Sequence, residues 1–200
     1  RGKDQLMCYG ENMPLDVLFV RDDDIPDLVQ EDVCDLGLVR LNVLEEKRLA
    51  MLARGTQPRI ELLQKLDFGR CRLSLAVPQD FVFEGLQSIA GKRIATTYPH
   101  VLGRFLRENS ITAEIVTLSG AVEIAPRLGR ADLICDLVST GSTLTANHLR
   151  EVAVVLESQV CLVRTPVALA DIKADWVRRL LVRVDGVQQV RESKYIMLHA

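Results

Sequence analysis

The sequence predicts an α/β protein with two lobes, in which mainly parallel sheets are flanked by helices. Short apolar runs alternate with helical segments of about ten residues, which is typical of βαβ units. The segments 31–39 and 129–138 each carry a helix end, a small turn, an aspartate and an apolar strand. Two similar lobes around a cleft would produce this echo, as would coincidence, because strand entries often carry Asp-Leu. Among 200 residues, 48% are apolar and 26% charged, which suits one large globular domain or two small lobes.

The elements follow from the apolar pattern: short runs predict strands, and recurrence at helical spacing predicts helices. The expected strands cover 15–20, 35–39, 60–66, 71–77, 93–97, 114–118, 132–138, 152–156, 160–163 and 194–200. The expected helices cover 44–54, 100–108, 122–128, 143–149 and 171–184, and another begins near 25. Asp24 is the expected cap of that first helix, Pro26 lies in its first turn, and Gly55 stops the second helix.

Charge, aromatic content and cysteine count exclude several classes of protein. The formal net charge is −2 and aromatic residues make up 4%, so neither a basic field nor a stacking platform for nucleic acid is expected. No run approaches the ~20 apolar residues of a membrane span, and no leader pattern opens the chain. The five cysteines are scattered and odd in number, which favours a reducing compartment over a disulfide or zinc framework. We therefore expect a cytoplasmic protein without nucleic-acid or membrane partners.

The stretch that carries chemistry is a hydroxyl-rich loop between an apolar strand and a helix, Ser139-Thr-Gly-Ser-Thr143. Hydroxyls and unpaired N–H groups at a helix start can bind a phosphate, and Gly141 lets the backbone close around it. Asp136, just upstream, can accept hydrogen bonds from a sugar diol. This spacing suits a phosphoribosyl group, although an ordinary helix cap would use the same hydroxyls.

The loop and its upstream acid resemble the diphosphoribosyl (PRPP) loop of phosphoribosyltransferases, although Cys135-Asp136 supplies one acid where most members have two. The longer pattern is similar to the signature of ATP phosphoribosyltransferase: Glu123, Gly129, Ala131, Ile134, Asp136-Leu137, Thr140-Gly141 and Thr143-Leu144. Further segments of that family follow in order along nearly the whole chain: 11–14, 20–26, 35–37, 42–46, 66–75, 91–95, 98–100 and 191–197. The likeness is greatest to the long form of the family.

The resemblance implies the first step of histidine biosynthesis, in which the phosphoribosyl group of PRPP is transferred to the adenine ring of ATP and pyrophosphate is released. It implies a pentosyltransferase that uses Mg²⁺, and a homo-oligomer, either a dimer or a hexamer. The implied fold is that of type II periplasmic binding proteins. Because one fold serves many functions, a two-lobed small-molecule-binding or regulatory module without catalysis is the alternative.

The resemblance also implies a division of the chain into lobes. The first lobe is expected at 1–70 plus 166–200, and the second, with the PRPP loop, at 71–165. The family begins with a further strand and a basic turn, which we expect to precede Arg1. The regulatory domain of the long form is expected beyond Ala200.

Two sets of binding residues are implied, and no catalytic acid or base. The PRPP set is Asp136, Ser139, Thr140, Gly141, Ser142, Thr143, Glu123 and Arg127. The ATP set is Asp67, Cys71, Tyr98, Pro99 and Arg21. Asp136 is also the expected metal contact, with most metal ligands supplied by substrate oxygens.

Several of these residues have structural alternatives. Glu123 and Arg127 would form an exposed ion pair if they lay on one helix face. Tyr98 and Pro99 would serve equally as a strand-to-helix turn, and Cys71 as a packed small residue. Arg40 and Arg130 stand where the family commonly has other residues, which puts charge near the edges of the expected cleft.

Overall fold

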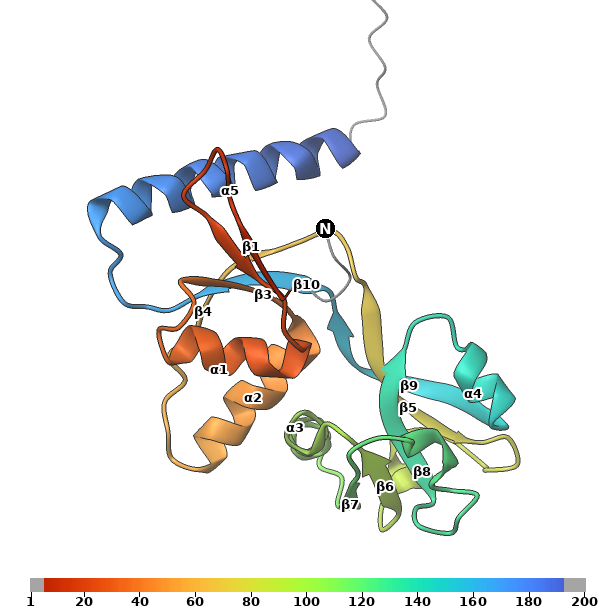
Figure 1. The fold of residues 1–200 in the computed structure, drawn as a ribbon. Helices are drawn as coiled ribbons and strands as arrows, with labels where there is room; N and C mark the ends of the chain where they lie inside the picture. The colour runs from red at the N-terminus through yellow and green to blue at the C-terminus, as the bar shows by residue number, and fades with distance from the viewer. Residues whose placement is uncertain (1–5, 193–200) are drawn as a thin grey trace, which may run out of the picture.

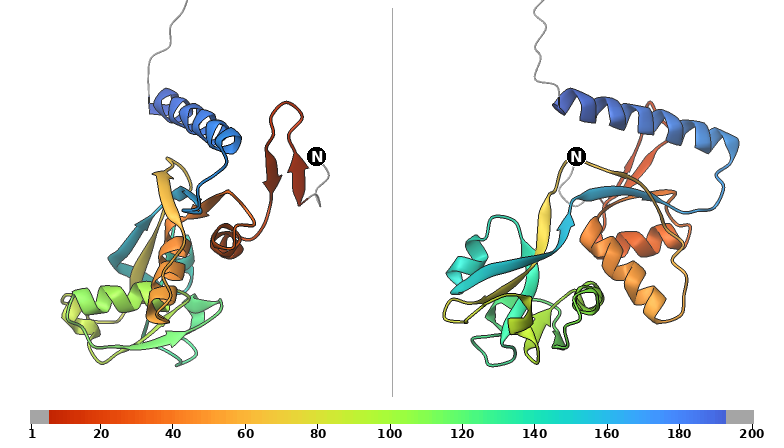
Figure 2. Two further views of the ribbon diagram at one scale, coloured as in Figure 1. Left: turned by 90° about the vertical axis from the view of Figure 1, so that its left-hand side faces the viewer. Right: turned by 180° about the vertical axis from the view of Figure 1, so that it is seen from behind.

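The molecule has two lobes, each built on its own β-sheet (Figure 1). The computed structural model describes residues 6–192, with side-chain surroundings for residues 6–190. The rear view also shows the two sheets as separate units (Figure 2). The two-lobed α/β fold is therefore confirmed, while the expected strand at 194–200 lies outside the described residues.

The first lobe is built on a three-stranded antiparallel sheet in the order β3-β10-β4, comprising β3 (Leu36–Arg40), β10 (Val160–Arg164) and β4 (Glu61–Lys65). Helices α1 (Ile25–Gln30) and α2 (Leu41–Ala53) pack on it. The buried residues include Val29, Val39 and Leu44. Gly37 is required where α1 crosses β3, because a Cβ there would come within 2.8 Å of both Ile25 and Val29.

A hairpin and a long helix complete the first lobe, away from the five-stranded sheet of the second lobe (Figure 2). The hairpin pairs β1 (Met7–Tyr9) with β2 (Asp16–Leu18). The sequence predicted a strand at 15–20, and β2 covers the middle of that range; among the described residues it pairs only with β1, and it is exposed along its length. Helix α5 (Asp171–Glu192) begins where expected and continues past 184.

The second lobe is built on a five-stranded mixed sheet in the order β7-β6-β8-β5-β9. Its strands are β5 (Cys71–Pro78), β6 (Arg93–Thr96), β7 (Glu114–Thr117), β8 (Leu133–Val138) and β9 (Leu149–Ser158). The expectation of mainly parallel sheets is wrong: parallel pairing holds for β7-β6-β8, whereas β5 is antiparallel to both β8 and β9, and the sheet of the first lobe is antiparallel throughout. Strands β8 and β9 therefore run in the same direction on either side of β5, and the short helix between them lies in a crossover connection.

The helices of the second lobe are shorter than the sequence predicted, except for α3 (Pro99–Glu108). The expected helix at 122–128 is a single 3₁₀ turn, η3 (Val122–Ile124), because Pro126 cannot continue a helix. Helix α4 (Ser142–Ala146) stops before His148, which has φ +56° and leads into β9. Two further 3₁₀ turns are η1 (Asp22–Asp24) and η2 (Leu86–Ile89).

Helix starts and stops are only partly as expected. Asp24 makes no side-chain cap for α1, although Pro26 does lie in the first turn of that helix. Gly55 follows the end of α2 with φ +75°, as a helix stop should.

The chain crosses between the lobes twice, and the two crossings hydrogen-bond to each other. One is the loop 66–70 between β4 and β5, and the other is Gln159 between β9 and β10. The Leu66 N–H donates to the Val160 carbonyl at 2.7 Å, and the Val160 N–H donates to the Phe68 carbonyl at 3.1 Å. The lobe division remains a prediction with one correction: β10, assigned to 71–165, hydrogen-bonds to β3 and β4 of the first sheet.

Candidate active site

The hydroxyl-rich loop follows β8 directly, as the sequence predicted. Ser139 and Thr140 form the turn, Gly141 is the N-cap residue, and α4 begins at Ser142. Gly141 has φ +81°, a left-handed conformation that a side chain would strain. The hydroxyls of Thr140 and Ser142 lie 3.0 Å apart, and both residues are exposed. The loop therefore presents hydroxyl groups to solvent around a backbone turn that depends on glycine.

This loop forms one wall of a cavity of about 130 Å³. The cavity is lined by Glu123, Asp136, Leu137, Val138, Ser139, Thr140, Gly141, Thr143 and Leu144. Seven residues of the expected PRPP set are thus within this cavity or its loop. Arg127 is not part of the lining, since it is exposed beyond Pro126 in the turn that replaces the expected helix.

Asp136 lies partly buried in this cavity, and the burial shifts its pKa. Burial raises the pKa of Asp136, the Leu137 N–H that donates to its carboxylate at 2.8 Å lowers it, and nearby Glu123 raises it again. The lining therefore combines two acids with hydroxyl oxygens and contains no cation. Oxygen donors of this kind suit Mg²⁺. Within residues 6–190, no three His, Cys, Asp or Glu side chains gather closely enough to hold a metal unaided.

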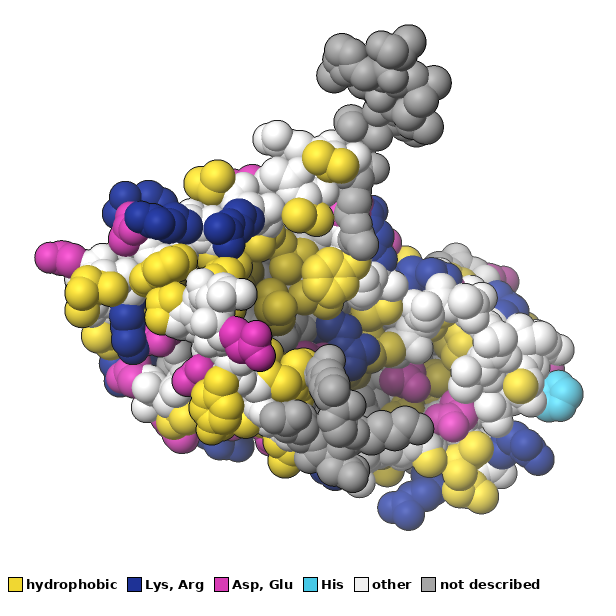
Figure 3. Space-filling view, turned by 45° about the horizontal axis from the view of Figure 1, so that its top comes forward, with side chains coloured by type: hydrophobic (Ala, Val, Ile, Leu, Met, Phe, Trp, Pro, Cys, Tyr) yellow, Lys and Arg dark blue, Asp and Glu magenta, His cyan; other side chains and the backbone are white. Residues whose placement is uncertain are grey.

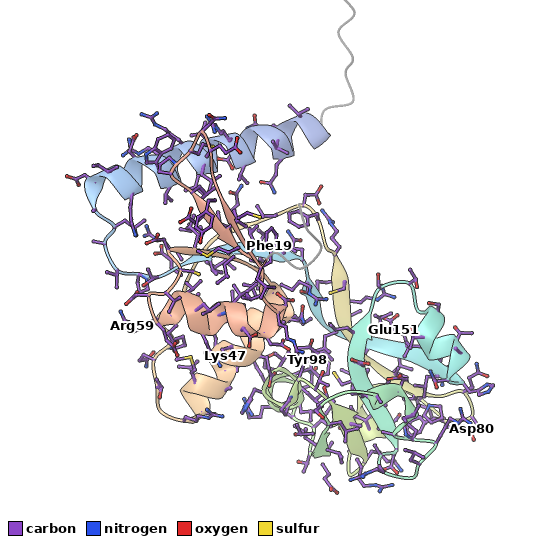
Figure 4. All side chains as sticks on the ribbon, viewed as in Figure 1. Phe19, Lys47, Arg59, Asp80, Tyr98 and Glu151 are labelled. Atoms are coloured by element: carbon purple, nitrogen blue, oxygen red, sulfur yellow. The ribbon has the colours of Figure 1, made fainter. Side chains whose placement is uncertain are left out.

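Tyr98 and Pro99 lie at the start of α3, where the two lobes touch. The Asn42 side-chain amide, on α2, donates to the Tyr98 hydroxyl at 3.0 Å. The Glu46 carboxylate accepts hydrogen bonds from the N–H groups of His100 and Val101, both at 2.9 Å. Figure 4 shows Tyr98 between the ribbons of the two lobes. The start of α3 is thus capped by a carboxylate from the other lobe.

The remaining residues of the expected ATP set lie apart from the loop cavity. Asp67 forms an ion pair with Arg70, and both line a second, polar cavity of about 330 Å³ beside α5. Cys71 is the first residue of β5, and Arg21 precedes η1 and is exposed. The structure therefore does not bring Asp67 into the cavity that holds Asp136.

Sequence reasoning missed a polar network between the lobes. Asn42 is fully buried and its side-chain oxygen accepts a hydrogen bond from the Ser158 hydroxyl at 2.7 Å. The Asn42 N–H donates to the same Ser158 oxygen at 3.1 Å. The available signal was an asparagine between apolar residues at 41 and 43, which on a buried helix start needs a polar partner.

A second missed group lies beside Asp136 on the five-stranded sheet. Arg72 donates to the Glu151 carboxylate through Nε and Nη2, both at 2.5 Å, and the Ser74 hydroxyl donates to it at 2.8 Å. Ser74 is the direct register partner of Asp136. Arg72 lowers the pKa of Glu151, so this carboxylate stays ionised while Asp136 is shifted the other way.

Two α/β lobes with an acid and a hydroxyl loop at one strand end define a two-lobed ligand-binding fold whose site suits a sugar phosphate. The model of the family "HisG: ATP phosphoribosyltransferase" matches residues 21–186. The chain therefore belongs to the ATP phosphoribosyltransferase family, pentosyltransferases of histidine biosynthesis that use ATP and PRPP. This family membership, rather than the fold, decides against a binding module without catalysis.

Solved structures agree with this assignment. The ATP phosphoribosyltransferase (HisG:HisZ) complex of Thermotoga maritima matches with a TM-score of 0.70 at 28% identity, over 89% of this chain and 81% of that chain. A probable extracellular amino-acid-binding protein of Bacillus subtilis matches with a TM-score of 0.53 at 15% identity, over 88% and 76%. A Candida albicans protein with the periplasmic binding protein fold matches with a TM-score of 0.59 at 16% identity, over 88% and 62%. The last two likenesses show the fold alone.

Among the helices that the structure describes, none combines the length and the apolar character that crossing a membrane demands.

Proposed function

We propose that the phosphoribosyl transfer takes place at the cavity formed by Glu123, Asp136 and the loop 139–143. The observation that carries this proposal is the convergence of a half-buried acid and an exposed hydroxyl loop in one cavity. The hydroxyls and backbone N–H groups of the loop suit the 5′-phosphate of PRPP, and Asp136 suits its ribose hydroxyls. Arg127 stays in the proposal as a contact from outside the cavity lining.

In the proposed reaction, a ring nitrogen of adenine forms a bond to the anomeric carbon of PRPP while the bond from that carbon to pyrophosphate breaks. Positive charge develops on the ribose, as in other glycosyl transfers. A neutral ring nitrogen needs no strong base for this attack, and we assign none. Most of the catalysis then consists of holding two large anions in reacting geometry.

The two acids of the cavity are the residues proposed to help hold Mg²⁺. Asp136 would contact the ion or the water around it, Glu123 would lie nearby, and substrate oxygens would supply most ligands. When bound, Mg²⁺ neutralises charge on the diphosphate leaving group.

ATP is proposed to bind between the lobes, in contact with Cys71, Tyr98 and Pro99 of the second lobe and Arg21 of the first. The position of Tyr98 supports this proposal, because Tyr98 belongs to the second lobe and its hydroxyl is hydrogen-bonded to Asn42 of the first lobe. Asp67 remains a proposed contact from the neighbouring polar cavity. We further propose a cytoplasmic homo-oligomer, a dimer or hexamer; the Thermotoga maritima relative is itself a complex.

The test is the release of pyrophosphate by the purified protein with PRPP, ATP and Mg²⁺. Glu123→Gln keeps the shape of the side chain and removes its charge, so turnover should fall at least about tenfold. Glu114→Gln, on the exposed edge strand β7, is the matched control and should behave as the unmodified protein. Absence of pyrophosphate release from the unmodified protein, or equal rates for the two variants, contradicts the assignment.

A further inference from the structure

Arg40 is fixed at the point where the first lobe meets the second. It is the last residue of β3 and the N-cap residue of α2. Its register partner is Val160, the first residue of β10 after the crossing. The next N–H, that of Leu41, donates to the carbonyl of the crossing residue Gln159 at 3.0 Å. The backbone of Arg40 is therefore held beside the crossing, whatever its side chain does.

The Arg40 side chain is held by one acid and uses only part of its guanidinium. Nε donates to Asp22 Oδ2 at 2.6 Å, and the Arg40 N–H donates to Oδ1 at 3.3 Å. The side chain of Arg40 is 42% exposed, against 24% for Asp22. Within the described part of the chain, Asp22 is the one carboxylate paired with Arg40, and its side-chain hydrogen bond uses Nε rather than Nη1 or Nη2.

Arg40 lies at the edge of the first lobe that adjoins the crossing into the second lobe. In the space-filling view the surface is hollowed between the lobes, and acidic and basic side chains meet there (Figure 3). Asp22 raises the pKa of Arg40, with smaller contributions from Cys71 and Tyr98, which both belong to the second lobe. The pKa of Tyr98, raised chiefly by burial, is influenced by both Arg40 and Asp136. Arg40 and Asp136 are thus both near enough to Tyr98 to influence its hydroxyl.

The lining of the loop cavity carries no positive charge. Two acids and no cation line the loop cavity. Both substrates of the family reaction are polyphosphates, and a guanidinium binds two phosphate oxygens at once through its planar fork. A cation on the first lobe would balance the negative charge of the substrate phosphates, which the acidic lining of the cavity cannot balance.

We propose that Arg40 binds the phosphate chain of a substrate in the hollow between the lobes, sharing its guanidinium between that chain and Asp22. The inference rests on the proposed function, because it takes PRPP and ATP to meet in this hollow. The triphosphate of ATP and the diphosphate of PRPP offer the same chemistry to Arg40. Separate titrations with each substrate decide which phosphate chain it holds.

The competing explanation is that the ion pair only fastens β3 to η1. Four variants separate the two: Arg40→Gln, Arg40→Lys, Asp22→Asn and Arg164→Gln. Arg164 is the matched control, because its Nε pairs with Glu61 at 2.7 Å at the other end of the same strand ladder. If the pair were only a fastener, Arg40→Gln and Asp22→Asn would weaken binding alike.

The experiment measures dissociation constants by calorimetry for PRPP, ATP, inorganic pyrophosphate and tripolyphosphate. We expect Arg40→Gln to bind at least one substrate about tenfold more weakly, with an intermediate loss in Arg40→Lys. Asp22→Asn should bind the same substrate as tightly as the unmodified protein or more tightly, because it frees the guanidinium. Arg164→Gln should bind as the unmodified protein does.

Unchanged binding of all four compounds by Arg40→Gln would overturn the proposal, as would equal losses in Arg40→Gln and Asp22→Asn. If the unmodified protein binds neither PRPP nor ATP, the proposed function fails, while the pyrophosphate and tripolyphosphate titrations still decide the role of Arg40. Absence of binding to these two compounds as well would remove both.

Discussion

The side-chain amide of Asn42 reaches across from α2 and donates a 3.0 Å hydrogen bond to the hydroxyl of Tyr98 at the start of α3. The same asparagine holds Ser158, one residue before the crossing into β10. One buried side chain therefore ties together the first lobe, the second lobe and the segment that joins them. Its removal should be felt in the stability of the whole chain.

Replacing Asn42 with alanine should destabilise the protein by about 1–3 kcal/mol for each polar group left buried without a partner. The Ser158 hydroxyl loses its acceptor and keeps the backbone N–H of residue 42, and the half-buried Tyr98 hydroxyl loses its donor. Tyr98→Phe is the matched variant, because it removes one hydrogen bond and leaves the bond between Asn42 and Ser158. Urea unfolding should give the order unmodified protein, Tyr98→Phe, Asn42→Ala. An Asn42→Ala variant as stable as the unmodified protein would show that the network contributes nothing.

Glu46→Gln should weaken the contact between α2 and α3. The carboxylate caps two N–H groups at the start of α3 and places negative charge at the positive end of that helix. Loss of such a cap lowers stability by about 0.5–2 kcal/mol. Glu108→Gln, at the exposed end of the same helix, is the control and should change little. Thermal unfolding compares the two, and equal midpoints would contradict the role given to Glu46.

Thr140→Val should weaken PRPP binding while the fold stays intact. The substitution keeps the shape of the side chain and removes its hydroxyl, and a hydrogen bond to a charged phosphate contributes about 1.5–3 kcal/mol. Thr117→Val makes the same change on the exposed edge strand β7, away from the cavity. Calorimetric titration with PRPP and Mg²⁺ should separate them by about tenfold or more. Equal affinities would remove Thr140 from the phosphate site.

Asp136→Asn should abolish most turnover and yet stabilise the unliganded protein at neutral pH. Burial raises the pKa of Asp136 in the folded state. The Asp136 carboxyl group therefore contributes fully to the free energy of unfolding below its unfolded-state pKa. This contribution is lost as the pH rises through the folded-state pKa. Asparagine avoids this loss, so unfolding at pH 7 should require more urea.

Asp132→Asn is the matched control on the neighbouring turn, with the opposite sign. The Arg93 side chain and N–H lower the pKa of Asp132. Its contribution is present above the unfolded-state pKa and is lost as the pH falls through the folded-state pKa. Asp132→Asn should therefore lose stability at pH 7. Shifts of the same sign in both variants would contradict the two environments described.

Local sequence chemistry predicted the elements whose ends are marked by special residues. Pro99 begins α3 and Gly55 follows the end of α2, as their backbone preferences require. The helix predicted at 122–128 was wrong. The apolar spacing is helical, but Pro126 lacks the N–H that would continue a helix beyond the first turn. The direction of β5 could not be predicted, since an apolar run reads the same in parallel and antiparallel pairing.

The candidate site was predictable where it is contiguous in the chain. Asp136 and the loop to Thr143 are eight consecutive residues, so a strand leading into a turn brings them together. The partners of Tyr98 could not be found in this way, because Asn42 lies 56 residues away and no local pattern joins them. Similarly, the pairing of Arg40 with Asp22 depends on how η1 folds against β3.

The two hydrogen-bonded crossings have a mechanical consequence for the lobes. A single connecting strand would let one lobe swing about any axis. The two connections are joined side by side by the hydrogen bonds of Val160. We therefore expect the lobes to bend about this pair of segments more easily than they slide past each other. The bond from Asn42 to Tyr98 lies off that pair of segments and acts as a stop. We therefore expect the opening between the lobes to keep nearly the same width whether empty or filled, so that little ordering remains to be done when substrates arrive.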